Sequence, residues 1–463
     1  GFVVSDWSSV TEMINHGYAE DEKHAAAIAI NAGVDMEMAT TSYYDNFKAL
    51  LEEKKITQEQ IDNAVRNILR VKYRLGLFDN PYTNPEASGK ILDPAFLDHA
   101  RTVARQSAVL LKNENNTLPI SAERVSSVAV IGPLSDAPRD QLGTWCFDGR
   151  AENSVTPLRA IRELLGDSRV NYVQALAYSR DKNKSAFAEA VSAARRSDVV
   201  LFFGGEEYIL SGEARSRGEI NIPGAQTELL EELAATGKPV ILVIMAGRPL
   251  AIGRELELSD AVLYAWHPGT MAGPAIADLL FGKESPSGKL PVTFVKGAGQ
   301  IPFYYYRNNT GRPPSAKSWI PFDSIPTVNP QISLGDKSFH LDYGFTPLFP
   351  FGYGLSYTTF DYSDIVLSSK VMKMDGSLTV KAKITNSGNM DADEIVQFYV
   401  HDRVGSITRP IKELKGYNRL RIGKGETAEV EFTLTAADLA FFNGKETVTE
   451  PGKFDVWIGP SSE

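Results

Sequence analysis

The first 75 residues alternate short apolar runs with helical spacing of apolar positions. Residues 2–4 and 33–38 indicate strands, the first of them a buried one, and helical patterns cover residues 10–32, 43–53 and 57–75. The last helix opens with Thr57 and Gln60 in the spacing of a capping box. This order of strands and helices predicts parallel β/α units. Two units cannot form a stable sheet alone, so we expect more strands upstream.

A second α/β rhythm follows a loop-like segment of Asn-Pro, Ser-Gly and Asp-Pro pairs. Four nearly continuous runs of Val, Ile and Leu predict strands over residues 128–132, 198–204, 239–245 and 261–266. Helical patterns separate them over residues 185–197, 225–236 and 272–281. Strands without polar alternation are typical of sheets that are covered on both faces. The pattern therefore predicts an open α/β domain.

The pattern changes again towards the C-terminus. Residues 301–358 are rich in Pro, Gly, Tyr and Phe and show no clear periodicity. After them, apolar and polar residues alternate over residues 364–367, 377–385, 394–401, 426–434 and 453–459. Short alternating strands with no helix between them are typical of a β-sandwich.

Composition narrows the class of protein. The 463 residues, 43% of them hydrophobic, are too many for one ordinary domain, so we expect two or three. A net charge of -10 disfavours a nucleic-acid or anionic-membrane partner and is compatible with a neutral ligand such as a sugar. No apolar run approaches the roughly 18 residues that would span a membrane. The single cysteine, Cys146, excludes an internal disulfide and a cysteine-cluster metal site.

The N-terminus has neither a starting Met nor a signal peptide pattern, and an apolar strand begins at once. We interpret the chain as a fragment that starts inside a domain. Common catalytic motifs are missing as well: there is no Gly-x-Ser-x-Gly, no His-Glu-x-x-His and no clustering of the six His residues. Gly288-Lys289 is a near miss for a phosphate loop, with Leu290 where Ser or Thr is needed.

Carboxylates remain as the candidate chemical groups. Asp6 ends the first predicted strand and is followed by Trp7. A carboxylate at the end of a barrel strand, beside an aromatic ring that can stack on a sugar, suits glycoside cleavage. The alternative is that Asp6 caps a helix or accepts a loop hydrogen bond. The second candidate is the charged, Gly-rich segment 204–219, which follows a predicted strand; its alternative is a solvated loop whose Glu and Arg residues pair with each other.

Seven short motifs occur in order along the chain: Val4-Ser5-Asp6-Trp7, Tyr73–Phe78, Leu110–Asn115, Leu118-Pro119-Ile120, Ser287–Pro291, Phe351–Tyr357 and Thr408-Arg409-Pro410. Each motif is weak alone, but their order over the whole chain is highly specific. Together they resemble glycoside hydrolase family 3, in particular its β-glucosidases of the bacterial periplasmic type.

The resemblance implies a multidomain fold of α/β and β parts. It predicts the C-terminal part of a (β/α)8 TIM barrel, an α/β sandwich domain and a fibronectin type III-like β-sandwich. The predicted boundaries are the last two barrel units at 1–77, a linker at 78–95, the sandwich domain at 96–310, an irregular linker at 311–358 and the β-sandwich at 359–463. In this family, most contacts to the non-reducing sugar come from barrel strands that precede these two units.

The same resemblance implies a retaining mechanism. Asp6 matches the nucleophile and Glu213 the general acid/base, with Glu206 or Glu207 as alternatives for the second role. Such enzymes hold the two carboxyl groups about 5–5.5 Å apart, with the acid protonated at working pH. No cofactor and no metal are needed.

Other residues are candidates for substrate contacts. Trp7 is expected to line the sugar subsite and Trp145 the aglycone side, unless Trp145 is a core or interface aromatic. Arg215 and Arg217 are candidate substrate-binding residues, and one of them is expected to orient the acid/base loop, unless either forms only a surface ion pair. Glu37 and Met38 end the second predicted strand and either border the pocket or pack at its rim.

The leading functional prediction is an exo-acting β-glucosidase of β-linked oligosaccharides or aryl glucosides, periplasmic or secreted by resemblance. The alternatives are a β-xylosidase or broader exo-glycosidase, and a non-catalytic carbohydrate-binding fragment. A peptide-recognition role for the β-sandwich would rest on fold analogy alone. Residues 403–420 are a candidate contact in a homodimer.

Overall fold

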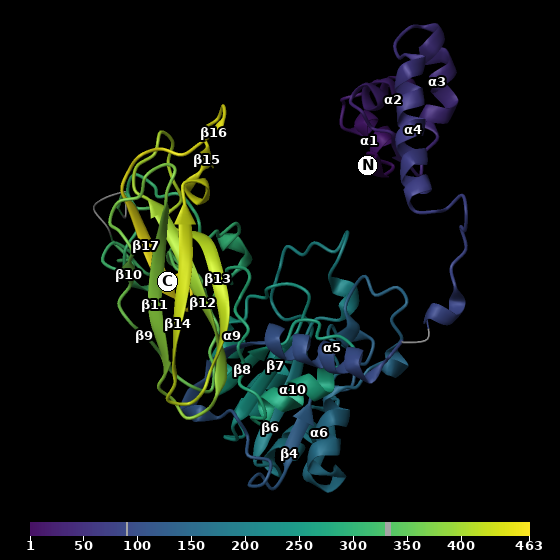
Figure 1. Cartoon of the computed structure of the whole chain (residues 1–463). Coiled ribbons are helices and arrows are strands. Elements are labelled where there is room, and N and C mark those ends of the chain that lie inside the picture. Colours follow the sequence, from purple (N-terminus) through teal and green to yellow (C-terminus); the bar gives the residue numbers. More distant parts are fainter. Residues whose placement is uncertain (89–90, 329–334) are drawn as a thin grey trace. The chain divides into compact units, whose positions relative to one another are not determined.

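The computed structural model describes residues 1–88, 91–328 and 335–463 (Figure 1). The chain divides into two compact units, Gly1–Ile91 and Leu92–Glu463. No helix in the described ranges is both long and apolar enough to cross a membrane.

In its described residues, the first unit contains two parallel strands and four α-helices. They are β1 (Val4–Trp7), α1 (Ser9–Asn15), α2 (Glu22–Asn31), β2 (Met36–Met38), α3 (Ser42–Glu52) and α4 (Gln58–Arg74). The stretch 10–32 is two helices because Gly17 turns the chain at φ 70° and Asp21 caps α2 by accepting from the His24 amide. The capping box of Thr57 and Gln60 at the start of α4 is confirmed.

The prediction that the first strand is buried is wrong. Val3 is 54% exposed and Val4 is 41% exposed. Among the described residues β1 pairs only with β2, so its apolar side chains have neighbours on one edge alone. The core of this unit instead lies between the helices, where Leu50, Ala25 and Ala26 are fully buried.

The second unit begins with an open α/β domain built on a six-stranded sheet, in the order β3-β8-β7-β6-β4-β5. Its strands are β3 (Val109–Asn113), β4 (Val128–Ile131), β5 (Val170–Val173), β6 (Val199–Gly205), β7 (Val240–Met245) and β8 (Ala261–Tyr264). The four predicted strands are confirmed as β4, β6, β7 and β8. All neighbours are parallel except β3, which pairs antiparallel with β8 at one edge.

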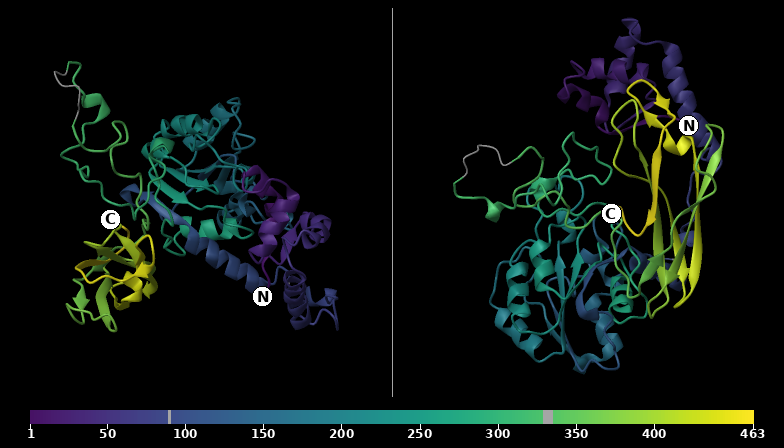
Figure 2. Two further views of the ribbon diagram at one scale, coloured as in Figure 1. Left: turned by 90° about the horizontal axis from the view of Figure 1, so that it is seen from above. Right: turned by 90° about the vertical axis from the view of Figure 1, so that its left-hand side faces the viewer.

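Helices cover both faces of this sheet, as the apolar strands predicted (Figure 1 and Figure 2). One face packs on α6 (Pro157–Leu165) and α10 (Ala272–Leu280), with α5 (Pro94–Ser107) lying against α10. The other packs on α7 (Phe187–Arg195), α8 (Gln226–Ala234) and α9 (Gly253–Leu258). The strand residues divide between the two cores in alternation: Phe202 faces the α8 side and Phe203 the α10 side.

The last part of the chain is a sandwich of two antiparallel sheets. One sheet has the order β10-β11-β14 with β9 also paired to β11, and the other has the order β13-β12-β17. The strands of the two sheets are β9 (Phe360–Tyr362), β10 (Val366–Leu367), β11 (Ser377–Asn386), β12 (Ala392–Asp402), β13 (Glu413–Ile422), β14 (Thr427–Thr435) and β17 (Phe454–Gly459). A separate two-stranded sheet is formed by β15 (Phe441–Phe442) and β16 (Thr447–Val448). The β-sandwich predicted from alternation is thus confirmed, with β13 as a strand that the pattern missed.

The sandwich is tied to the α/β domain by buried polar contacts. Lys289, in the segment that follows α10, lies 3.2 Å from Glu394 of β12, and both side chains are largely buried. The described residues of the intervening segment 301–358 form no α-helix or extended strand, as expected from its lack of periodicity. They contain one short 3-10 helix, Phe322–Ser324. Near the end of the segment, the amide of Leu355 donates to the carbonyl of Leu110, which ties this segment back to β3.

Candidate active site

Loops that follow four neighbouring strands lie together in the α/β domain. Because β4, β6, β7 and β8 are parallel, their carboxyl ends share one edge of the sheet, where ligands bind in open α/β folds. The loop after β4 contains Thr144 and Trp145, and the loop after β6 contains Glu213. The loops after β7 and β8 contain Arg248 and His267.

Hydrogen bonds connect these loops directly. The Thr144 hydroxyl donates to the carbonyl oxygens of Ser211, at 2.9 Å, and Tyr208, at 3.0 Å. The Ser211 hydroxyl in turn lies 3.3 Å from Nε2 of His267. Burial lowers the pKa of His267 to about 4, so this imidazole is neutral at ordinary pH. The loop after β6 is therefore joined by side chains to those after β4 and β8.

A hollow of about 440 Å³ opens between the loops after β4 and β6. Trp145 and Phe147 lie on its wall, with ring centroids 5.7 Å apart and the rings nearly perpendicular. Both are well exposed, at 59% and 81%. Such aromatic faces can stack on a sugar ring or on an aromatic aglycone. Trp145 is thus a surface aromatic of this hollow and is not part of the core.

Glu213 also lines this hollow. Its side chain is exposed, and within the described ranges no hydrogen bond or ion pair engages its carboxylate. The flanking backbone has unusual geometry, since Gly212 has φ 106° and Ala214 has φ 56°. Glu213 is thus a carboxylate presented to solvent by a tightly turned loop.

The two alternative acids have different surroundings. Glu206 is fully buried, and its oxygens are engaged by Arg217 and by Nε of Arg248, the latter at 2.9 Å. Glu207 accepts from the Ser179 hydroxyl at 2.7 Å and from Arg180 Nε at 2.9 Å. Neither side chain offers a free carboxyl group to a ligand.

The electrostatic surroundings of Glu207 also disfavour it as the general acid. Burial raises the pKa of Glu207, but the hydrogen bonds from Arg180 and Ser179 outweigh burial and leave the pKa below its ordinary value. A general acid needs a pKa near the working pH, so Glu207 is poorly suited to donate a proton.

The two predicted arginines bind the loop itself. Arg215 donates through Nε to the carbonyl of Ile209 at 3.0 Å. Arg217 engages Glu206 and donates to the carbonyl of Asn221 at 3.1 Å. Both guanidinium groups therefore organise the loop, in keeping with the orienting role expected for one of them, while direct substrate binding by either stays a prediction.

Asp6 and Trp7 end β1 in the first unit. Both side chains are exposed, Trp7 by 70%, and the Asp6 carboxylate accepts a hydrogen bond from the amide of Trp7 at 2.7 Å.

The Glu37 carboxylate stabilises the start of α3. It accepts hydrogen bonds from the Tyr43 amide and the Thr40 hydroxyl, both at 2.6 Å. Met38 is half-exposed and is the pairing partner of Trp7 between β2 and β1.

Sequence reasoning did not single out Arg248, Thr144 or His267. One available signal was Gly247-Arg248, which lies one residue beyond the confirmed strand 239–245, at the end where ligands bind in such sheets. Gly247 is required there, since a Cβ atom would lie 2.3 Å from the Ser211 hydroxyl oxygen.

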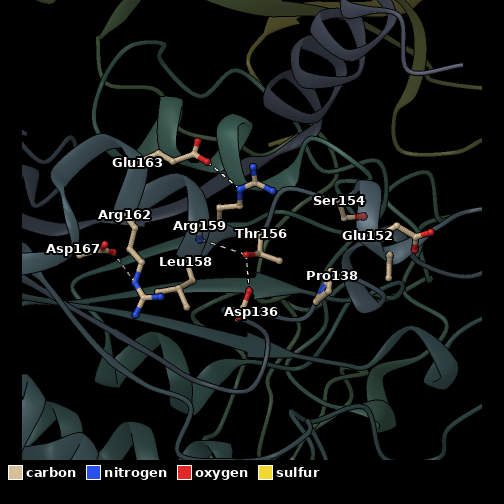
Figure 3. A pocket seen from close by; sticks show the side chains of 11 residues that line it. Asp136, Pro138, Glu152, Ser154, Thr156, Leu158, Arg159, Arg162, Glu163 and Asp167 are labelled. Atoms are coloured by element: carbon tan, nitrogen blue, oxygen red, sulfur yellow. Dashed lines mark hydrogen bonds and ion pairs between the residues drawn. The ribbon is translucent and has the colours of Figure 1, made fainter. Parts of the chain in front are cut away.

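A second hollow, of about 560 Å³, lies beside α6 and contains none of the predicted site residues (Figure 3). Its two arginines are paired with carboxylates of the same hollow: Arg159 pairs with Glu163 at 3.0 Å, and Arg162 lies 3.5 Å from Asp167. Thr156 caps α6 and donates to Asp136 at 2.7 Å.

In the part of the chain that the structure describes, no group of three or more His, Cys, Asp or Glu side chains is arranged to hold a metal ion.

Comparison with known proteins agrees with this architecture. Residues 1–71 match the glycosyl hydrolase family 3 N-terminal domain, residues 108–357 its C-terminal domain, and residues 394–462 a fibronectin type III-like domain. A periplasmic β-glucosidase of Salmonella typhimurium is 40% identical, over 100% of this chain and 62% of that protein. A β-xylosidase of Formosa agariphila is 35% identical, over 100% of this chain and 63% of its own length.

Solved structures give the same result. A β-glucosidase of Listeria innocua in complex with glucose superposes with a TM-score of 0.90 at 36% identity, covering 100% of this chain and 61% of that one. A mutant of that enzyme, crystallised with laminaribiose, superposes equally well, with a TM-score of 0.90. The chain spans 62% of the length of the Salmonella relative. Since the C-terminal domain of the family alone accounts for more than half of its residues, the chain belongs to glycosyl hydrolase family 3.

Proposed function

We propose that this chain carries the catalytic residues of a retaining exo-β-glycosidase that releases terminal, non-reducing β-D-glucosyl residues. The single observation that carries the proposal is Glu213, an exposed carboxylate without a protein partner among the described residues, on a hollow walled by Trp145 and Phe147. The alternatives Glu206 and Glu207 are both engaged by arginines. β-Glucosidases among the relatives support glucose as the sugar.

The proposed mechanism is a double displacement. The Asp6 carboxylate attacks the anomeric carbon and forms a glycosyl ester, while the glycosidic bond breaks and Glu213 transfers its proton to the leaving oxygen. Glu213 then takes a proton from water, whose oxygen attacks the anomeric carbon and releases Asp6. The sugar leaves with its β configuration retained, and no cofactor takes part.

Two aromatic residues are proposed to recognise the substrate. Trp7 follows the nucleophile and would stack on the glucosyl ring. Trp145, on the wall of the hollow beside Glu213, would contact the aglycone. The substrates are proposed to be β-linked oligosaccharides or aryl β-glucosides, and the Salmonella relative supports a periplasmic or secreted protein.

A second candidate is a β-xylosidase or a broader exo-glycosidase, which the β-xylosidase of Formosa agariphila favours. A non-catalytic carbohydrate-binding role would use the same aromatic hollow without turnover. The homodimer contact predicted for residues 403–420 stays a prediction; the stretch from Glu413 onwards lies in β13, paired with β12.

The test is covalent labelling with 2,4-dinitrophenyl 2-deoxy-2-fluoro-β-glucoside, followed by intact mass and peptide mapping. The 2-fluoro group slows hydrolysis of the glycosyl ester, so the expected result is one added fluoroglucosyl group on Asp6. The matched 2-deoxy-2-fluoro-β-xyloside compares the two sugars, and faster labelling by the xyloside would favour the second candidate. A label on another residue would overturn the nucleophile assignment. Measured binding of a β-linked oligosaccharide without a label from either reagent would favour the binding role.

A further inference from the structure

Arg248 contacts the backbone on both sides of Glu213. It is the third residue after β7, and its side chain is only 18% exposed. Its Nη2 nitrogen donates to the carbonyl oxygen of Leu210 and, at 2.8 Å, to that of Arg215. These two carbonyls lie three residues before and two residues after Glu213. One nitrogen atom thus holds together the two ends of the short segment that presents the proposed acid/base.

Glu206 fixes the other edge of the same guanidinium group. Its carboxylate accepts from Arg248 Nε at 2.9 Å and is fully buried. The Glu206 amide donates to the carbonyl of Met245 at 2.8 Å, which ties this residue to the end of β7. A buried charge is tolerated only where it is paired, so the Glu206–Arg248 pair constrains both partners strongly. The anchor of Arg248 is therefore tied by its backbone to the sheet.

The segment needs such an anchor because its own backbone is strained. Ala214 has φ 56°, in the left-handed region that non-glycine residues adopt only at a cost. Gly212 has φ 106° and passes close to Thr144, against which a Cβ atom would lie at 2.7 Å. A short exposed loop would relax from this conformation unless its ends were held.

We infer that Arg248 is the positioning residue of the proposed acid/base, with Glu206 as its counter-ion. It clamps the Leu210–Arg215 segment so that the Glu213 carboxyl group is delivered in one orientation to the leaving oxygen. This inference rests on the proposed function of Glu213. Arg217, which also engages Glu206, donates to neither of the two clamped carbonyls and has the lesser role.

The test is the dependence of hydrolysis on the leaving group in an Arg248→Met variant. A 2,4-dinitrophenyl β-glucoside needs no proton on its leaving oxygen, whereas a 4-methoxyphenyl β-glucoside does. We expect kcat/KM for the methoxyphenyl substrate to fall about 100-fold or more, since general acid catalysis contributes roughly 10²–10⁴-fold, and that for the dinitrophenyl substrate to fall far less. A purely structural defect would lower both substrates equally, and that outcome would overturn the inference.

Arg254→Met is the matched control. Arg254 also binds two carboxylates, of Glu231 and Glu257, each at 2.9 Å, but it lies on the surface of α9. Its variant is expected to leave the ratio of the two rates unchanged. Amide hydrogen exchange of residues 208–216 gives a readout that needs no turnover: it should accelerate in Arg248→Met only. Unchanged exchange in Arg248→Met would contradict the clamp.

A Glu213→Ala variant separates this inference from the function on which it rests. If Glu213→Ala selectively loses kcat/KM for the methoxyphenyl substrate but Arg248→Met does not, the positioning role of Arg248 is refuted and the acid/base assignment of Glu213 stands. An unchanged ratio in Glu213→Ala would instead refute the acid/base assignment, and Arg248 would be left as a structural support of the loop.

Discussion

The Nε atom of Arg248 lies 2.9 Å from a carboxylate oxygen of Glu206, although 42 residues separate them in the chain. Glu206 is fully buried and also engages Arg217, so its carboxylate forms ion pairs with two guanidinium groups at once. Removing one partner of a buried ion pair leaves an uncompensated charge in a medium that solvates it poorly. Glu206 is therefore expected to matter for stability more than most surface carboxylates.

We predict that Glu206→Ala lowers the free energy of unfolding of the second unit by about 3–5 kcal/mol. Urea unfolding followed by circular dichroism measures this change. The matched control is Glu231→Ala, which removes the exposed Arg254 pair and should cost under about 1 kcal/mol. Equal losses in the two variants would contradict the buried network.

The second prediction separates Glu213 from Glu207. Azide can replace the missing base in an acid/base variant by attacking the glycosyl-enzyme directly. We expect azide to accelerate the slow hydrolysis of 2,4-dinitrophenyl β-glucoside by Glu213→Ala and to produce β-glucosyl azide, detected by NMR. Glu207→Ala should show neither the acceleration nor the azide product, because the Glu207 carboxylate is already hydrogen-bonded to Arg180 and Ser179. Azide rescue of Glu207→Ala alone would exchange the two assignments.

The third prediction concerns the loop backbone next to Glu213. A Cβ atom on Gly212 would lie 2.7 Å from Thr144 and 3.3 Å from the Trp145 indole nitrogen, at φ 106°. Gly212→Ala should therefore displace Trp145, shift tryptophan fluorescence and lower kcat/KM for aryl β-glucosides by about 10-fold or more, as misplacements near 1 Å do. Gly218→Ala is the control in the same loop, since a Cβ atom on Gly218 would meet nothing within 4 Å. Similar effects of both changes would contradict the close approach.

The fourth prediction is a pH dependence of stability. Burial lowers the pKa of His267 to about 4, whereas an unfolded His has a pKa of about 6.5. As the pH falls, the unfolded chain therefore takes up the proton first. The stability that neutral His267 contributes is complete above about pH 6.5 and is lost as the pH falls towards about 4.

Between about pH 7 and pH 4.5, the unfolding free energy should thus fall more in the wild type than in His267→Gln, by on the order of 2 kcal/mol. Burial raises the pKa of Asp140 and of Glu255, so their protonation at lower pH favours the folded state and opposes the effect of His267. The quantity to measure is therefore the difference in unfolding free energy between the wild type and His267→Gln. Parallel pH profiles would show that His267 is not buried as a neutral group.

Features that depend on near neighbours in the chain were predictable. The capping box at Thr57 joins residues three apart, and the strands β4, β6, β7 and β8 are marked by continuous apolar runs that only a covered sheet accommodates. The strand β13 was missed because its exposed and half-buried positions alternate poorly, with several Lys, Arg and Asn residues. The family resemblance added the candidate roles of Asp6 and Glu213, which spacing alone left open.

The sequence by itself determined the order of β/α units, the β-sandwich and the position of the carboxylates at strand ends. Only the tertiary structure decided which of the three candidate acids, Glu206, Glu207 and Glu213, has no partner among the described residues. Glu206 meets Arg248 because β6 and β7 are neighbours in the sheet, and Glu207 meets Arg180 across a loop. The exposure of Val3 and Val4 has the same origin, since burial depends on which other strands pair with β1. Pairing between distant segments is set by the packing of the whole sheet, and no local pattern encodes it.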